Sequence, residues 1–166
     1  PKIGQHVDHE AELALVISKV SKNISKDNWT EHVLGLTAAN DLSERVLQGK
    51  TGHFTRAKGF DTFCPLGPSL VTSDEIPDPQ GLSIKTHLNG QTMQDHTTGD
   101  MIFSVAEIIS FLSQDTTLLP GTAILTGTPQ GVGFARQPPV WLRPGDEITI
   151  EIENIGSLTN PVIAPN

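Results

Sequence analysis

Two glutamates one residue apart, Glu10 and Glu12, lie in the largely apolar stretch from Val7 to Lys19. In an extended strand alternate side chains share a face, so both carboxylates point the same way, with Cα atoms roughly 6–7 Å apart. At an effective dielectric of about 20 their repulsion costs roughly 2–3 kcal/mol. Two carboxylates held in a buried strand need a cation or protons. The alternative is a strand end at the surface, where water solvates both acids.

A third acid, Asp41, precedes a predicted helix over Leu42–Gln48. Asp41 and Glu44 match the N-cap and capping-box positions of such a helix, which is a purely structural role. Arg45 and Gln48 follow Asp41 by four and seven residues, so a helix would place all three side chains on one face. An acid, a guanidinium and an amide together suit a site for a metal and an anionic ligand. Both interpretations stay open at this point.

Length and composition restrict the class of protein. The 166 residues suit one domain with a sizeable core, and 36% hydrophobic content indicates a globular chain. The net charge of −8, without a Lys/Arg cluster, argues against nucleic-acid binding. The single cysteine, Cys64, excludes an intrachain disulfide and a multi-cysteine zinc site. No apolar run approaches the roughly 20 residues of a membrane span, so we expect no membrane partner.

The start of the chain has no signal-peptide pattern and begins with Pro1-Lys2 rather than Met. We therefore expect a processed or partial chain. We also expect an intracellular protein, either cytoplasmic or mitochondrial.

The elements that must position these acids are mostly short strands. Scattered glycines and prolines punctuate the chain, and Asn89-Gly90 predicts a type I′ hairpin. A helix is predicted over Val105–Ser113, with Ser104 and Glu107 as its capping box. The predicted strands are Glu12–Ser18, Val33–Ala38, Ser69–Thr72, Leu82–Leu88, Ala123–Thr126 and Glu147–Glu153.

Two glycine-containing segments were tested as phosphate sites. Gly49-Lys50-Thr51 resembles the end of a P-loop, but Glu44 occupies the position of the required first glycine. The segment TGTPQGVG (Thr126–Gly133) lacks the strand–GxGxxG–helix context of a dinucleotide site. We predict instead that its backbone approaches a small ligand at a strand end.

Collinear segments along nearly the whole chain resemble the fumarylacetoacetate hydrolase family. The resemblance is to its small members: acylpyruvate hydrolases, oxaloacetate decarboxylases or tautomerases, and hydroxyheptadienedioate isomerases. It implies an α+β, β-rich fold, a mixed β-sandwich roll with a few short helices, over one catalytic domain, 1–166. The segments are VDHEAELALVI, ANDLSERVLQ, RAKGFDTFCPLGP, DPQGLSIKTHLNGQTMQ, MIFSVAEIISFLS and LPGTAILTGTPQGVG.

The resemblance also implies a set of site residues. The family's E-x-E and distant Asp fall on Glu10, Glu12 and Asp41, a carboxylate set that suits Mg²⁺, with Mn²⁺ or Ca²⁺ as alternatives. Catalytic roles fall on Lys58 and Thr128. The substrate-binding positions are Arg45, Gln48, Lys58, Gly127 and Thr128.

This chain departs from the family pattern in two respects. The family commonly has S-A-R-D-x-Q after the metal-binding Asp. Here the corresponding segment is Ser43–Gln48, in which Glu44 replaces the Ala and Val46 replaces the Asp, while Arg45 and Gln48 are kept. The family's catalytic His–Glu pair lies on a lid loop upstream of the E-x-E strand, so we expect this chain to lack that segment and its general base. His9 and His53 are the first candidates for a base within the chain.

The resemblance implies a Mg²⁺-dependent enzyme acting on small 2-oxo or 1,3-dicarbonyl acids. The reaction would be C–C hydrolysis, decarboxylation or keto–enol tautomerisation through a metal-stabilised enolate. These reactions share one site, so the sequence does not separate them. The alternative is a non-catalytic member of the fold that binds a metal and an oxo acid. We also expect a homodimer, because small family members commonly associate and exposed strand edges benefit from cover.

Overall fold

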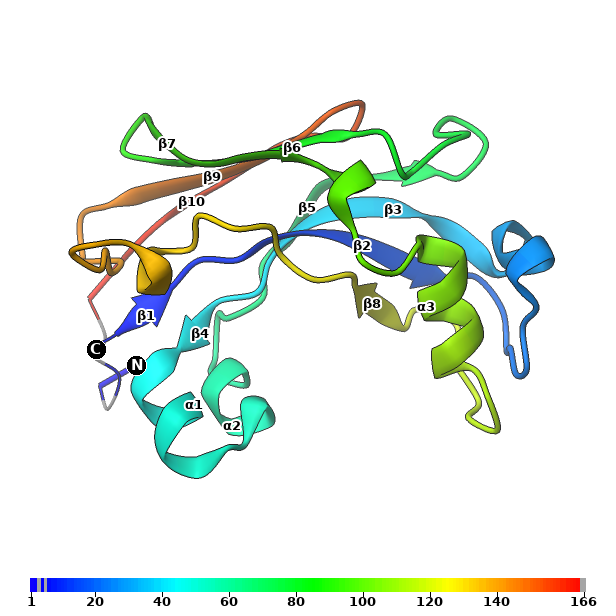
Figure 1. Cartoon of the computed structure of the whole chain (residues 1–166), viewed down its shortest axis with the longest axis horizontal. Coiled ribbons are helices and arrows are strands. Elements are labelled where there is room, and N and C mark those ends of the chain that lie inside the picture. The colour runs from blue at the N-terminus through cyan, green and yellow to red at the C-terminus, as the bar shows by residue number, and fades with distance from the viewer. Residues whose placement is uncertain (3, 5, 165–166) are drawn as a thin grey trace.

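Two four-stranded antiparallel sheets make up most of the molecule (Figure 1). This computed structural model describes residues 1–2, 4 and 6–164. The first sheet has the order β10 (Gly156–Pro161), β9 (Glu147–Ile152), β6 (Ser83–Leu88) and β7 (Gln91–Thr97). The second has the order β5 (Leu66–Thr72), β3 (Val33–Asn40), β2 (Ala11–Ile17) and β8 (Ala123–Leu125).

The remaining elements are short. Strands β1 (Val7–Asp8) and β4 (Ser43–Glu44) pair with each other beside the second sheet. The helices are α1 (Arg45–Thr51), α2 (Phe54–Lys58) and α3 (Val105–Leu112), with 3-10 turns η1 (Lys26–His32), η2 (Thr98–Asp100) and η3 (Gly133–Ala135). Every predicted strand is present, and the β-rich α+β fold is confirmed. Sequence reasoning missed β1, β4, β10 and α2.

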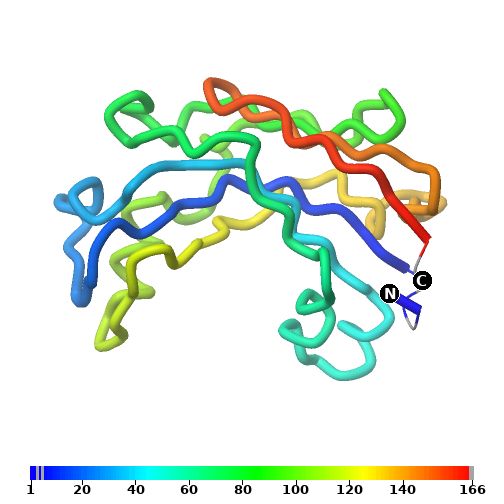
Figure 2. Tube along the Cα trace, turned by 180° about the vertical axis from the view of Figure 1, so that it is seen from behind, coloured from blue at the N-terminus to red at the C-terminus, as the bar shows by residue number. Residues whose placement is uncertain are grey.

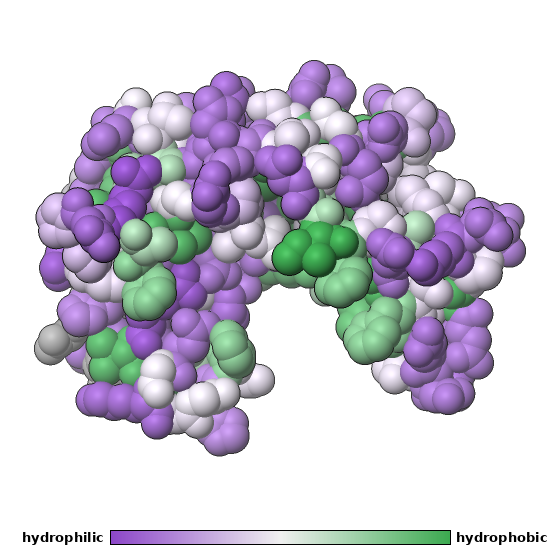
Figure 3. Space-filling model, in the orientation of Figure 1, coloured by the Kyte–Doolittle hydropathy of each residue, from purple (hydrophilic) through white to green (hydrophobic). Residues whose placement is uncertain are grey.

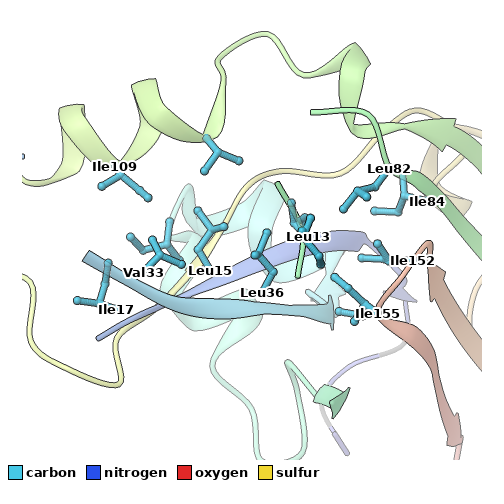
Figure 4. Close-up of a cluster of buried hydrophobic side chains, with 14 of the residues drawn as sticks. Leu13, Leu15, Ile17, Val33, Leu36, Leu82, Ile84, Ile109, Ile152 and Ile155 are labelled. Carbon is cyan, nitrogen blue, oxygen red and sulfur yellow. The ribbon is translucent and has the colours of Figure 1, made fainter. Parts of the chain in front are cut away.

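One apolar core joins the two sheets and α3. Leu13, Leu15 and Ile17 alternate along β2 and are almost fully buried. They belong to the same cluster as Ile152 of β9 and Ile109 of α3, as Figure 4 shows. Burial of each such side chain stabilises the fold by roughly 1.5–3 kcal/mol. Because strand side chains alternate, this packing turns Glu12, between Ala11 and Leu13, to the other face of β2.

Local signals placed α3 and the hairpin correctly. Ser104 accepts a hydrogen bond from the Glu107 amide and Glu107 accepts one from the Ser104 amide, which is the predicted capping box. Asn89 and Gly90 have φ of 51° and 80°, as a type I′ turn between β6 and β7 requires.

The predicted start of the first helix was wrong. Helix α1 begins at Arg45, and Glu44, not Asp41, is its N-cap, accepting a 2.7 Å hydrogen bond from the Leu47 amide. The chain before it pairs with β1 through β4, and this tertiary contact overrides the local capping pattern. Asp41 therefore lies outside the helix, and the expected shared helical face with Arg45 is also wrong.

The two sheets and the helices leave a hollow along one edge. Helices α1 and α2 lie below the second sheet on one side of this hollow, and α3 lies on the other side (Figures 1 and 3). The first and the last described residues lie near each other, as the view from behind shows (Figure 2). Within the described part of the chain, none of the helices has the length and apolar character needed to cross a membrane.

Candidate metal centre and substrate site

Three carboxylates converge in the second sheet where its inner strand β2 begins and its inner strand β3 ends. One oxygen each of Glu10, Glu12 and Asp41 lies within 4.8 Å of the others. The turn from β3 holds them together, because the Asp41 amide donates to the Glu10 carbonyl at 2.9 Å. The Glu10 amide donates in turn to Asn40 Oδ1 at 3.0 Å. Glu10 and Glu12 are buried, so water solvates their carboxylates little.

Lys58, the last residue of α2, supplies positive charge to this group. Its ammonium donates to Glu10 Oε2 at 2.7 Å and also to Asp41 Oδ2. Burial alone would lower the pKa of Lys58, but the hydrogen bonds to Asp41 and Glu10 outweigh it and raise that pKa. Lys58 is therefore a fixed cation at physiological pH.

Arg45, the first residue of α1, is the second cation. Its Nη2 lies 2.8 Å from Asp8 Oδ2 and 2.7 Å from Glu10 Oε1, and its Nη1 donates to Gln48 Oε1 at 3.1 Å. Its Nε also donates to Asp8 Oδ2, at 2.9 Å. Burial opposes the charge, yet the contacts with Glu10 and Asp8 raise the pKa of Arg45. These contacts take up most of the guanidinium N–H groups.

Glu12 is the carboxylate of this group whose negative charge is least compensated by neighbouring cations. Burial raises its pKa to about 7, with smaller contributions from Asp41 and Glu10. The Gly127 amide donates to Glu12 Oε2 at 2.6 Å and partly offsets this rise. Glu12 is thus the member of the group that exchanges a proton near neutral pH.

The glycine-rich turn after β8 carries Gly127 and Thr128 beside the carboxylates, as predicted for a strand-end ligand site. Buried Gln94 of β7 donates from its amide nitrogen to Thr128 Oγ1 at 2.9 Å and to the Pro129 carbonyl at 2.8 Å. Because the Thr128 oxygen accepts here, its own proton is available for another acceptor.

A cavity of about 650 Å³ begins at this turn. It meets the site at Gly127 and Thr128, and Met101 and Phe103 line it farther away. None of the three carboxylates is among its lining residues, and Glu12 lies on the opposite face of β2 from Leu13, which does line it. The volume suits a small ligand.

The structure brings together most of the predicted residues. Glu10, Glu12, Asp41, Lys58, Arg45, Gln48, Gly127 and Thr128 form one connected group. Two further candidates lie apart from this group. His53 is exposed at the start of α2, and His9 is buried with its Nδ1 3.6 Å from Asp8 Oδ1. Sequence reasoning missed two participants, Asp8 and Gln94. The position of Asp8 two residues before Glu10 was the available signal for it.

The donor set fits a hard divalent cation. All three donors are carboxylates, the ligand type that Mg²⁺, Mn²⁺ and Ca²⁺ prefer. An ion with bonds of roughly 2.0–2.6 Å joins oxygens up to roughly 4–5 Å apart, and the three oxygens lie within 4.8 Å of one another. The site also already attracts a cation, since the Lys58 ammonium bridges two of the three acids.

Comparison with known proteins gives concordant matches. The family described as "Fumarylacetoacetate (FAA) hydrolase C-terminal" matches residues 1–163. Among curated proteins, "Oxaloacetate tautomerase FAHD2A, mitochondrial" of Bos taurus is 48% identical over 165 residues, covering 98% of this chain and 52% of the relative. This chain thus spans about half the length of the curated relatives it matches.

Two solved structures show the same fold. The fumarylacetoacetate hydrolase of psychrophilic Exiguobacterium antarcticum superposes with a TM-score of 0.96 at 40% identity, covering 99% of this chain and 59% of that one. The 2-hydroxyhepta-2,4-diene-1,7-dioate isomerase of Mycobacterium marinum gives 0.90 at 44% identity, covering 98% and 61%.

Proposed function

The chain belongs to the fumarylacetoacetate hydrolase family, and on that premise we propose a divalent-metal-dependent enzyme that interconverts the keto and enol forms of small 2-oxo acids. The observation that carries the proposal is the convergence of three carboxylates within 4.8 Å beside a lysine and a glycine-rich turn. Tautomerisation is favoured because curated relatives are named oxaloacetate tautomerase and a structural neighbour is named an isomerase. C–C hydrolysis and decarboxylation pass through a similar enolate and are alternatives at the same site.

Glu10, Glu12 and Asp41 would hold the ion, for which we propose Mg²⁺, with Mn²⁺ or Ca²⁺ as alternatives. When bound, such an ion supplies Lewis acidity to the 2-oxo and carboxylate oxygens of a substrate.

The remaining side chains stabilise and orient the substrate. The Lys58 ammonium stays charged and places positive charge where an enolate oxygen develops. Thr128 offers its hydroxyl proton, because its oxygen already accepts from Gln94. Arg45 lies behind Glu10 and contributes positive charge toward a substrate carboxylate, while Gln48 accepts a hydrogen bond from its guanidinium on α1. Gly127 fixes Glu12 through its amide.

The proposal is tested by following the enol absorbance of oxaloacetate with Mg²⁺ and with EDTA, beside hydrolysis of acetylpyruvate. We expect metal-dependent tautomerisation that exceeds hydrolysis. Activity that persists in EDTA would contradict the metal dependence. Binding of Mg²⁺ and oxalate without turnover of any 2-oxo acid would instead support a non-catalytic binding protein.

The raised pKa of Glu12 predicts that stability of the metal-free protein falls with rising pH. The folded-state pKa of about 7 lies above the ordinary value of 4.5, so protonation favours the folded state. This stabilisation is complete below about pH 4.5 and is lost as the pH rises through 7. The shift corresponds to about 3 kcal/mol.

Bound Mg²⁺ should reverse this trend, because it requires the ionised carboxylate. The ionised fraction of Glu12, and with it the Mg²⁺ affinity, should fall about tenfold from pH 8 to pH 6. Thermal unfolding with and without Mg²⁺ at pH 6, 7 and 8 measures both effects. An Mg²⁺-induced rise in Tm that is the same at each pH would argue against Glu12 as a ligand.

We also propose that the protein is an intracellular homodimer. Exposed apolar side chains on and beside α3, Ile102, Phe103 and Phe111, support an association surface, and green atoms gather on this side of the hollow in Figure 3. Sedimentation velocity at micromolar concentration distinguishes a dimer from a monomer.

A further inference from the structure

Asp8 is the most enclosed carboxylate of the site, with no solvent exposure, and it accepts five hydrogen bonds. Oδ1 accepts from the amides of His9 at 2.9 Å and Gly133 at 2.7 Å. Oδ2 accepts from the Phe134 amide at 3.0 Å and from Arg45 Nε and Nη2 at 2.9 and 2.8 Å. A buried charge with this many donors has one orientation only.

On one side, Asp8 fixes the plane of the Arg45 guanidinium. The paired contacts of Nε and Nη2 orient the guanidinium, and the Phe134 ring lies 5.7 Å from its central carbon. Held in this way, Arg45 reaches Glu10 Oε1 at 2.7 Å. The other oxygen of Glu10 is then turned toward Lys58 and the three-carboxylate group.

On the other side, Asp8 accepts hydrogen bonds from the C-terminal end of the glycine-rich turn. The two ends of this turn are tied to acids of the same segment, because Glu12 accepts from Gly127 and Asp8 accepts from Gly133 and Phe134. The backbone approaches closely there: a Cβ at Gly133 would lie 1.9 Å from the Val140 carbonyl oxygen and 2.7 Å from Asp8 Oδ1.

We infer that Asp8 is a positioning residue of this site. Through Arg45 it sets the orientation of Glu10, and through Gly133 and Phe134 it sets the turn that carries Gly127 and Thr128. This inference rests on the proposed function for the substrate side of the site. Asp8 itself belongs neither to the three-carboxylate group nor to the residues described as lining the cavity.

The first test is Mg²⁺ titration calorimetry of Asp8→Asn, a nearly isosteric change that removes the charge. Outer-sphere partners of metal ligands typically contribute 10–100-fold to affinity, so we expect Mg²⁺ affinity to fall by about tenfold or more. In the Arg45→Gln background the same substitution should change Mg²⁺ affinity less than it does alone, because the route to Glu10 is already removed and only the route through the turn, Gly127 and Glu12 is left. Asp95→Asn, the same change at an exposed acid on β7, is the matched control.

The second test reads the turn separately, by oxalate binding at saturating Mg²⁺. Here Asp8→Asn should weaken oxalate about tenfold even in the Arg45→Gln background. Asparagine keeps only one acceptor oxygen, so either the Gly133 or the Phe134 amide loses its acceptor. If Asp8→Asn does not fold, Arg45→Lys tests the same link to Glu10, because it keeps the charge but loses the paired Nε and Nη2 donors. It should also weaken Mg²⁺ binding.

Several outcomes would overturn the inference. These are wild-type Mg²⁺ and oxalate affinities in folded Asp8→Asn, an undiminished effect on Mg²⁺ when Arg45 is absent, or unchanged Mg²⁺ affinity in Arg45→Lys. A lower Tm alone, with unchanged affinities, would mean that Asp8 only stabilises the fold. Wild-type protein that binds Mg²⁺ but turns over no oxo acid would overturn the proposed enzyme and leave these titrations decisive for Asp8. Wild-type protein that binds no divalent ion would overturn both.

Discussion

Glu12→Gln should abolish Mg²⁺ binding and turnover while leaving the metal-free protein at least as stable as wild type at pH 8. The substitution removes one of three carboxylate donors, and a neutral amide oxygen is a poor substitute for a carboxylate as a ligand of a hard cation. The stability change has the opposite sign because burial already disfavours the Glu12 charge and raises its pKa to about 7. A glutamine side chain still offers the Gly127 amide an oxygen to accept its hydrogen bond.

Calorimetric titration with Mg²⁺ and thermal unfolding at pH 8 measure the two effects on one sample. We expect at least about a hundredfold loss of Mg²⁺ affinity together with an unchanged or higher Tm without metal. Glu147→Gln, at an exposed position of β9, is the matched control and should change neither. Wild-type Mg²⁺ affinity in Glu12→Gln would remove this residue from the metal site.

The sequence was sufficient where the deciding interactions are local. Alternate side chains of an extended segment share a face, so the common side of Glu12 in β2 and Glu10 just before it could be predicted without knowing any partner. The same holds for the capping box at Ser104 and Glu107, which spans one helical turn.

Local reasoning failed at Asp41, because a contact with a distant part of the chain determines where the helix begins. The capping pattern there is as good as the one at Ser104, but β4 pairs with β1 and moves the helix start to Arg45. The acid freed from capping instead meets Lys58, which α2 brings back to the site. No pattern within the segment reports that pairing.

Asp8 and Gln94 were missed for the same reason. Asp8 meets the Gly133 amide across 125 residues of chain, and Gln94 accepts from the Ala11 amide across 83. The spacing of Asp8 from Glu10 indicates a shared face of the segment, but it gives no signal for a partner as distant as Gly133, and Gln94 has no spacing signal at all. Their roles become visible only when the turn after β8 is placed against β1 and β7.

The placed residues also show how the site balances its charge. Asp8, Glu10, Glu12 and Asp41 face only Arg45 and Lys58 in the hydrogen-bonded group. Four negative and two positive charges leave a net charge of −2 when all four acids are ionised, and a proton on Glu12 removes only one of these two negative charges. A divalent ion would neutralise both, which gives a physical reason why this arrangement favours a metal over a second lysine.

Lys58→Met tests the other half of this balance and should produce a loss of turnover with the metal retained. The methionine keeps the apolar length of the side chain but removes the ammonium that bonds to Glu10 and Asp41. Loss of a group that stabilises a developing oxyanion typically costs 10²–10³-fold in kcat. We therefore expect tautomerisation at saturating Mg²⁺ to fall at least about a hundredfold, with weaker binding of oxalate.

Mg²⁺ itself should bind Lys58→Met at least as tightly as wild type, because the ion no longer competes with an ammonium for two of its three ligands. The metal-free variant should have a lower Tm at neutral pH, since Glu10 and Asp41 lose their counter-ion, and Mg²⁺ should restore it. Lys85→Met, at a lysine of β6 that pairs with Asp95 at 3.4 Å, should leave turnover and Mg²⁺ affinity unchanged. Retained turnover in Lys58→Met would reduce this lysine to a counter-ion, whereas lost Mg²⁺ binding would mean that the ammonium holds the carboxylates in place for the metal.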